Sequence, residues 1–117
     1  MTVDRRTFGF LEDMLEHAEY AEAFVAGFDR AGFELNREKQ FAVVRALEII
    51  GEAAKSVPQP IRDLAPGIPW RQMASMRDKL IHHYFGVDLE IVWGTVTTDI
   101  PSLIAELRVL LPQLTVE

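Results

Sequence analysis

The residues most able to do chemistry lie close together in the segment MRDKLIHHYFG, between Met76 and Gly86. This segment contains Arg77, Asp78, His82, His83 and Tyr84. An arginine guanidinium is a permanent cation that suits a phosphate group. A histidine imidazole titrates near neutral pH and can act as a general acid or base. Together these residue types fit acid–base chemistry at a phosphodiester.

The spacing of the segment predicts that its polar groups surround one face of a helix. At about 100° per residue, one mostly apolar arc contains Trp70, Met73, Arg77, Leu80, Ile81 and Tyr84. Arg77 lies near the middle of this arc, and Asp78 and His82 share its flank. Because an unpaired buried charge is very costly, Arg77 needs an anionic partner.

The preceding predicted helix offers acids for that role. Its polar stripe consists of Arg45, Glu48, Glu52 and Lys55. The stripe can form ion pairs within its own helix, each worth roughly 0.2–0.5 kcal/mol. Alternatively, Glu48 or Glu52 pairs with Arg77, and the sequence leaves both interpretations open. Gly51, which costs about 1 kcal/mol relative to Ala in a helix, indicates close approach of a neighbouring helix.

Other chemistries lack their usual motifs. His82 and His83 are adjacent and diverge by about 100° on a helix, no His-Glu-x-x-His motif occurs, and cysteine is absent. We therefore expect no metal and no cofactor. A serine nucleophile elbow and a glycine-rich phosphate loop are also missing. A purely structural alternative stays open, in which Arg77 and Asp78 only tie helices together.

Composition predicts one domain, residues 1–117, with a single hydrophobic core. A net charge of −6 argues against indiscriminate nucleic-acid binding. Positive charge is nevertheless concentrated near the motif, at Arg71, Arg77 and Lys79, which suits a local phosphate site. The N-terminus has no secretory signal, and no window approaches the roughly 18 apolar residues of a membrane span. We expect a cytoplasmic protein without a membrane partner.

Hydrophobic periodicity predicts an all-α, up-and-down bundle of four main helices and no strand. They are expected at about 4–28, 36–57, 69–84 and after Asp88. Thr2 or Asp4, Asn36 and Asp88 are the expected caps. A proline-rich connector, with one short helical turn, joins the second and third helices. Pro101 should kink the last helix or split it, with Asp99 as a new cap.

The motif segment, read as RDKLIHHYFGVDLEIVW, resembles the signature of the HepT-like family of the HEPN superfamily. That signature is an Arg, a polar residue, three further positions, a His, any residue and a Tyr. Here it matches Arg77, Asp78, His82 and Tyr84. The segments RALEIIGEAAK and IPWRQM also resemble family segments, in the expected order.

This resemblance implies a HEPN-like bundle that forms a homodimer, with two Arg-x4-His sites facing one cleft. It implies a metal-independent endoribonuclease, the toxin of a type VII-like toxin–antitoxin pair. The implied antitoxin is a nucleotidyltransferase that transfers AMP to Tyr84. Arg77, His82 and Asp78 become the catalytic residues, and Glu52, Glu48 and His83 become candidates for a supporting role. The alternative is a non-catalytic helical module for dimerisation and for binding a nucleotidyltransferase partner.

Overall fold

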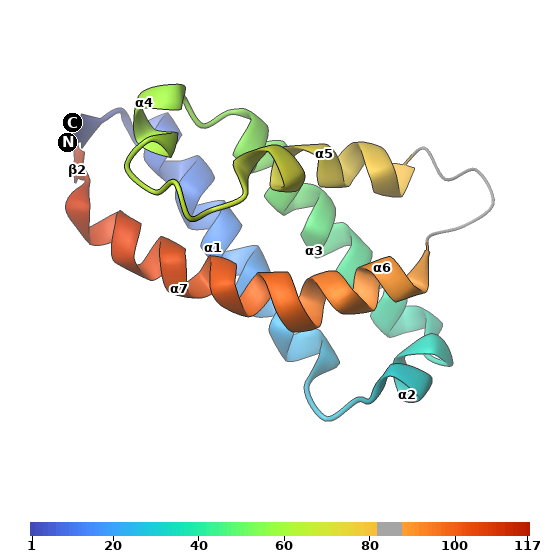
Figure 1. Cartoon of the computed structure of the whole chain (residues 1–117). Coiled ribbons are helices and arrows are strands. Elements are labelled where there is room, and N and C mark those ends of the chain that lie inside the picture. Colours follow the sequence, from blue (N-terminus) through green and yellow to red (C-terminus); the bar gives the residue numbers. More distant parts are fainter. Residues whose placement is uncertain (82–87) are drawn as a thin grey trace.

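The chain folds into an all-α bundle whose two termini meet at one end (Figure 1). The computed structural model describes residues 1–81 and 88–117. The longer helices are α1 (Arg5–Val25), α3 (Arg37–Lys55), α5 (Trp70–Ile81) and α7 (Ile100–Leu110). The shorter ones are α2 (Arg30–Glu34), α4 (Gln59–Arg62) and α6 (Leu89–Gly94). The predicted fold class is confirmed.

Helix α3 occupies the centre of the bundle, where α1 packs along one side of it and α5 along another (Figure 1). Helix α7 packs on α1. The most completely buried side chains come from these four helices and from α2. They include Leu11, Met14, Phe33, Leu47, Ile50, Met73, Leu103 and Leu107. Within the described ranges, no helix is both long enough and apolar enough to cross a membrane.

Side-chain caps fix the starts of α1, α3 and α6. The Asp4 carboxylate accepts a hydrogen bond from the Thr7 backbone N–H at 2.7 Å, so Asp4 rather than Thr2 caps α1. Asn36 Oδ1 accepts from the Lys39 N–H at 3.0 Å and caps α3. Asp88 Oδ1 accepts from the backbone N–H groups of Glu90 and Ile91 and caps α6. The caps predicted at Asn36 and Asp88 are confirmed.

The ends of two helices come earlier than predicted. Helix α1 ends at Val25, and Gly27 follows with φ +81°, a left-handed conformation that glycine adopts without strain. Helix α3 ends at Lys55, and the proline-rich connector contains the expected helical turn as α4. Helix α2, between Gly27 and Asn36, was not predicted because five residues are too few for a periodic pattern.

The last helical region is continuous rather than split. A π-helical turn, η1 (Thr95–Asp99), joins α6 to α7, and the Ile100 N–H donates to the Thr95 carbonyl oxygen. Asp99 has helical torsion angles (φ −81°, ψ −37°) and forms no capping hydrogen bond with its side chain, so the Asp99 cap was wrong. A capping residue needs an extended backbone, which this continuous path does not provide.

A short pair of parallel strands closes the fold where the termini meet. Strand β1 (Thr2–Val3) pairs with β2 (Thr115–Val116), and Thr2 lies opposite Thr115. The expectation of no strand was therefore wrong, since two residues are too short to show an alternating pattern. This pairing follows the 3-10 turn η2 (Leu111–Gln113) that ends α7.

Candidate functional site

Helices α3 and α5 approach each other closely at Gly51. A Cβ atom at this position would lie 2.9 Å from the Met73 carbonyl oxygen and 3.2 Å from the Arg77 backbone nitrogen. Both distances are shorter than ordinary contacts, so a side chain here would have to displace α5. The predicted role of Gly51 in close helix approach is confirmed, and the approaching helix is the one that carries Arg77.

We expect Gly51→Ala to lower the free energy of unfolding. Alanine is favoured over glycine within a helix by about 1 kcal/mol, but overpacking a tight contact typically costs about 1–3 kcal/mol. Gly9 in α1 is the matched control, because no described atom that would oppose a new Cβ lies within 4 Å of it. Gly9→Ala should raise stability. Denaturant unfolding of both variants tests the sign, and a Gly51→Ala protein stabilised like Gly9→Ala would contradict the close approach.

Arg77 shares a face of α5 with buried side chains but remains partly exposed. Its Nε atom is 2.7 Å from Oε1 of Glu52, and the Arg77 side chain is 39% exposed. Among the described side chains of α5, the buried positions are Trp70, Met73, Met76 and Leu80. At about 100° per residue, Arg77 lies between the buried Trp70 and Met73, so it belongs to the apolar face. The prediction that it lies near the middle of that face also depends on Ile81 and Tyr84, whose side chains lie outside the described residues.

Glu52 and Glu48 take different partners. Glu52 pairs with Arg77 across the two helices, whereas Glu48 Oε2 lies 3.3 Å from Nη1 of Arg45 within α3. Each of the two interpretations of the polar stripe is therefore correct for one of the acids. Glu52 therefore contacts Arg77, as a residue that supports this arginine must, whereas Glu48 does not contact Arg77.

A second salt bridge lies beside the first. Lys55 Nζ is 3.5 Å from Oδ1 of Asp78, and both side chains are about half exposed. The sequence placed Lys55 in the polar stripe but gave no sign of this partner, because the partner depends on how α5 packs on α3. Through Glu52 and Lys55, α3 thus holds two consecutive motif residues, Arg77 and Asp78.

The contact between Glu52 and Arg77 orients the guanidinium more than it stabilises the fold. Exposed salt bridges contribute only about 0.2–1 kcal/mol. Glu52 contacts Nε, so an anionic ligand would meet the terminal nitrogens Nη1 and Nη2, which match a phosphate in a two-pronged geometry. A half-exposed arginine fixed in this way can bind a phosphate oxygen.

The remaining motif residues follow α5 in the chain. The predictions for His82, His83 and Tyr84 concern residues that lie outside the described ranges. Among the described residues, no group of three or more His, Asp or Glu side chains is placed to hold a metal ion.

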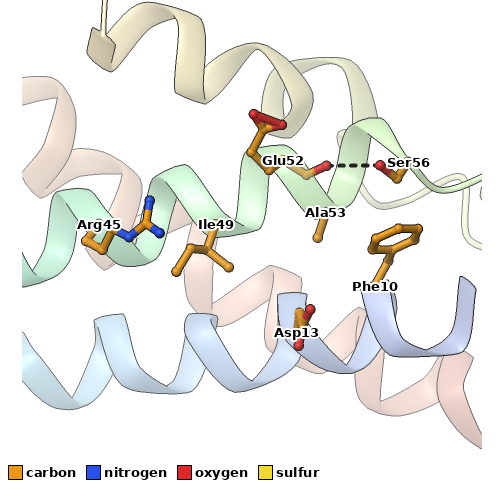
Figure 2. Close-up of a pocket in the computed structure, with 7 residues that line it drawn as sticks. All are labelled: Phe10, Asp13, Arg45, Ile49, Glu52, Ala53 and Ser56. Atoms are coloured by element: carbon orange, nitrogen blue, oxygen red, sulfur yellow. Dashed lines mark hydrogen bonds between the residues drawn. The ribbon is translucent and has the colours of Figure 1, made fainter. Parts of the chain in front are cut away.

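A groove next to this site was not predicted. It has a volume of about 290 Å³ and runs between α1 and α3 (Figure 2). Its lining consists of Phe10, Asp13, Arg45, Ile49, Glu52, Ala53 and Ser56. Glu52 therefore belongs to the groove wall and to the salt bridge with Arg77. Periodicity places Phe10 and Asp13 on one side of α1 but cannot say which helix packs beside them.

Comparison with known proteins gives a consistent result. A family model described as ribonuclease HepT-like matches residues 14–110. The "Probable ribonuclease HepT" of Thermococcus cleftensis is 54% identical over 94 residues, which cover 80% of this chain and 86% of that protein. The "Putative RNase MJ0125" of Methanocaldococcus jannaschii is 42% identical over 105 residues, covering 90% of each chain. No solved structure matches the chain.

Proposed function

The chain belongs to the HepT-like ribonuclease family, and on that premise we propose that it is a metal-independent endoribonuclease. The observation that carries the proposal is the half-exposed Arg77, held at Nε by Glu52. This arginine belongs to the Arg-x4-His motif. A cation suited to phosphate therefore lies five positions before His82, the candidate general acid or base.

RNA supplies its own nucleophile, which is why two side chains are enough for the reaction. The 2′-oxygen attacks the adjacent phosphorus and gives up its proton to a base, for which we propose His82. The bond from phosphorus to the 5′-oxygen breaks, that oxygen takes up a proton from water, and His82 returns its proton to the solvent. Arg77 stabilises the charge that develops on the phosphate oxygens. Asp78 orients or tunes His82 from the preceding turn.

The regulatory part of the proposal concerns a partner protein. We infer that the chain is the toxin of a type VII-like toxin–antitoxin pair and that it acts as a homodimer with two motifs facing one cleft. A nucleotidyltransferase antitoxin would transfer AMP to Tyr84. The added group is bulky and anionic, and close to Arg77 it would compete with the RNA phosphate for the guanidinium.

Cleavage of RNA by the purified, unmodified protein in the presence of EDTA tests the proposal. We expect products with a 2′,3′-cyclic phosphate at one end and a 5′-hydroxyl at the other, identified by mass spectrometry of a short defined oligonucleotide. RNA that stays intact both with EDTA and with added divalent ions would contradict the nuclease assignment. It would favour a non-catalytic helical module that binds the nucleotidyltransferase.

The assignment of Tyr84 as the AMP acceptor predicts a specific mass change. After co-expression with the cognate nucleotidyltransferase, the wild-type chain should gain the mass of one or more AMP groups, and Tyr84→Phe should gain none. Tyr20, which is exposed in α1 and donates a hydrogen bond to Glu16, provides the matched control. Tyr20→Phe should be modified like the wild type. A Tyr84→Phe chain that still gains AMP would remove Tyr84 as the acceptor.

A further inference from the structure

We propose that the groove between α1 and α3 binds one nucleobase of the RNA substrate, and that Asp13 selects a base with an exocyclic amino group. This inference rests on the proposed ribonuclease function and extends it to substrate selection. The groove and Arg77 flank α3 on different sides: Glu52 lines the groove, and its carboxylate, which points away from α1 in Figure 2, contacts Arg77 at 2.7 Å. We infer that an RNA strand with one base in the groove reaches Arg77 with a neighbouring phosphate, across the edge of α3 that Glu52 forms.

The floor of the groove suits the flat, apolar face of a base. Figure 2 shows Ile49 and Ala53 extending from α3 toward α1, with the Phe10 ring at one end of the groove. Phe10 is half-buried, and the Arg6 guanidinium carbon lies 5.6 Å from the centre of its ring. Bases commonly stack on aromatic rings and arginine guanidinium planes in single-stranded RNA recognition.

The polar rim supplies groups that can read the edge of a base. Asp13 lines the groove from α1, and its side chain is exposed (Figure 2). Among the described residues, no hydrogen bond or salt bridge engages its carboxylate, although its backbone carbonyl accepts from Nδ1 of His17. An ionised carboxylate only accepts hydrogen bonds, so it favours an amino group over a carbonyl oxygen. Cytosine offers that amino group, and uracil has a carbonyl oxygen in its place.

Arg45 provides a cation at the opposite end of the groove from Phe10 (Figure 2). Its side chain is 71% exposed and contacts Glu48 at 3.3 Å. An exposed salt bridge of this kind is weak, so Arg45 can exchange Glu48 for a phosphate of the same RNA strand. The groove thus combines an apolar floor, an acceptor and a cation, which are the parts that a nucleotide requires.

Size and charge favour a single base over a longer ligand. A volume of about 290 Å³ lies at the lower end of the range for small-molecule sites. The exposed acids of α1, Glu12, Glu16 and Glu19, would repel an RNA backbone that followed the helix. The RNA should therefore place one base in the groove and direct its phosphates toward Arg45 and Arg77.

Binding of short 2′-O-methylated oligonucleotides, which lack the nucleophilic hydroxyl, tests the proposal by fluorescence anisotropy. We expect the wild-type chain to bind oligo-C about tenfold more tightly than oligo-U. Asp13→Asn should abolish this preference, because an amide both donates and accepts. Phe10→Leu keeps an apolar side chain in the partly buried position and removes the ring, so both oligonucleotides should bind about tenfold more weakly.

Phe41→Ala is the matched control, since Phe41 is an aromatic residue of α3 that is 69% exposed and does not line the groove. It should bind both oligonucleotides like the wild type. Equal binding of oligo-C and oligo-U by the wild type, or Phe10→Leu binding like the wild type, would overturn the proposal. So would a Phe10→Leu chain that binds RNA normally and loses affinity for the nucleotidyltransferase, because the groove would then be a protein-docking site. RNA cleavage in EDTA would leave the proposed function intact in each of these cases.

Discussion

Replacing His82 with Ala should reduce RNA cleavage by about 10²–10⁴-fold, the usual contribution of a positioned general acid or base. The reduction should appear in EDTA and in its absence, because the proposed reaction uses no metal. Single-turnover cleavage of a labelled oligonucleotide measures the effect directly. Binding of a 2′-O-methylated oligonucleotide should change little, since the imidazole moves a proton and adds little affinity.

His83→Ala is the appropriate comparison for this variant. His83 is the same residue type in the adjacent position, but it lies outside the Arg-x4-His register. It is a candidate for support only, so its loss should reduce cleavage much less than the loss of His82. A His82→Ala chain that cleaves RNA as fast as the wild type would remove His82 from the catalytic role.

The elements of the fold that could be predicted are those with local causes. Asn36 and Asp88 cap their helices through hydrogen bonds to backbone N–H groups two or three residues away, and local sequence contains that information. The broad apolar surface of α3 likewise indicated its central position. The pairing of β1 with β2 joins Thr2 to Thr115, and nothing local to either segment indicates it.

In the candidate site, too, the predictable features have local causes, and the others depend on how the helices pack. The motif marked Arg77 and Asp78 as candidates, which they remain, whereas Gly51 correctly indicated a close helix neighbour. The choice of Glu52 over Glu48 as the partner of Arg77 depends on the rotation of α5 about its axis, which periodicity fixes only approximately. The exposure of Arg77 depends on the same rotation. The groove requires two helices to be placed side by side, so it could be found only in the structure.

Arg77→Ala should lower cleavage by about 10²–10³-fold, which is the typical loss when a group that stabilises developing charge is removed. It should lower stability only slightly, because an exposed salt bridge contributes about 0.2–1 kcal/mol. Arg77→Lys should not restore the rate. A lysine ammonium carries its three N–H donors on one nitrogen, so it cannot hold Glu52 and also offer a phosphate two parallel donors from separate nitrogens.

Arg108→Ala separates this catalytic effect from a structural one. Arg108 in α7 lies 3.6 Å from Glu19 in α1, so it also forms an exposed salt bridge between two helices. Its removal should cost about as much stability as Arg77→Ala and leave cleavage unchanged. If the two variants behave alike in both unfolding and cleavage, Arg77 only ties α3 to α5. Glu52→Gln refines the comparison, since it keeps an acceptor near Nε without the charge, and its cleavage rate should fall between those of the wild type and Arg77→Ala.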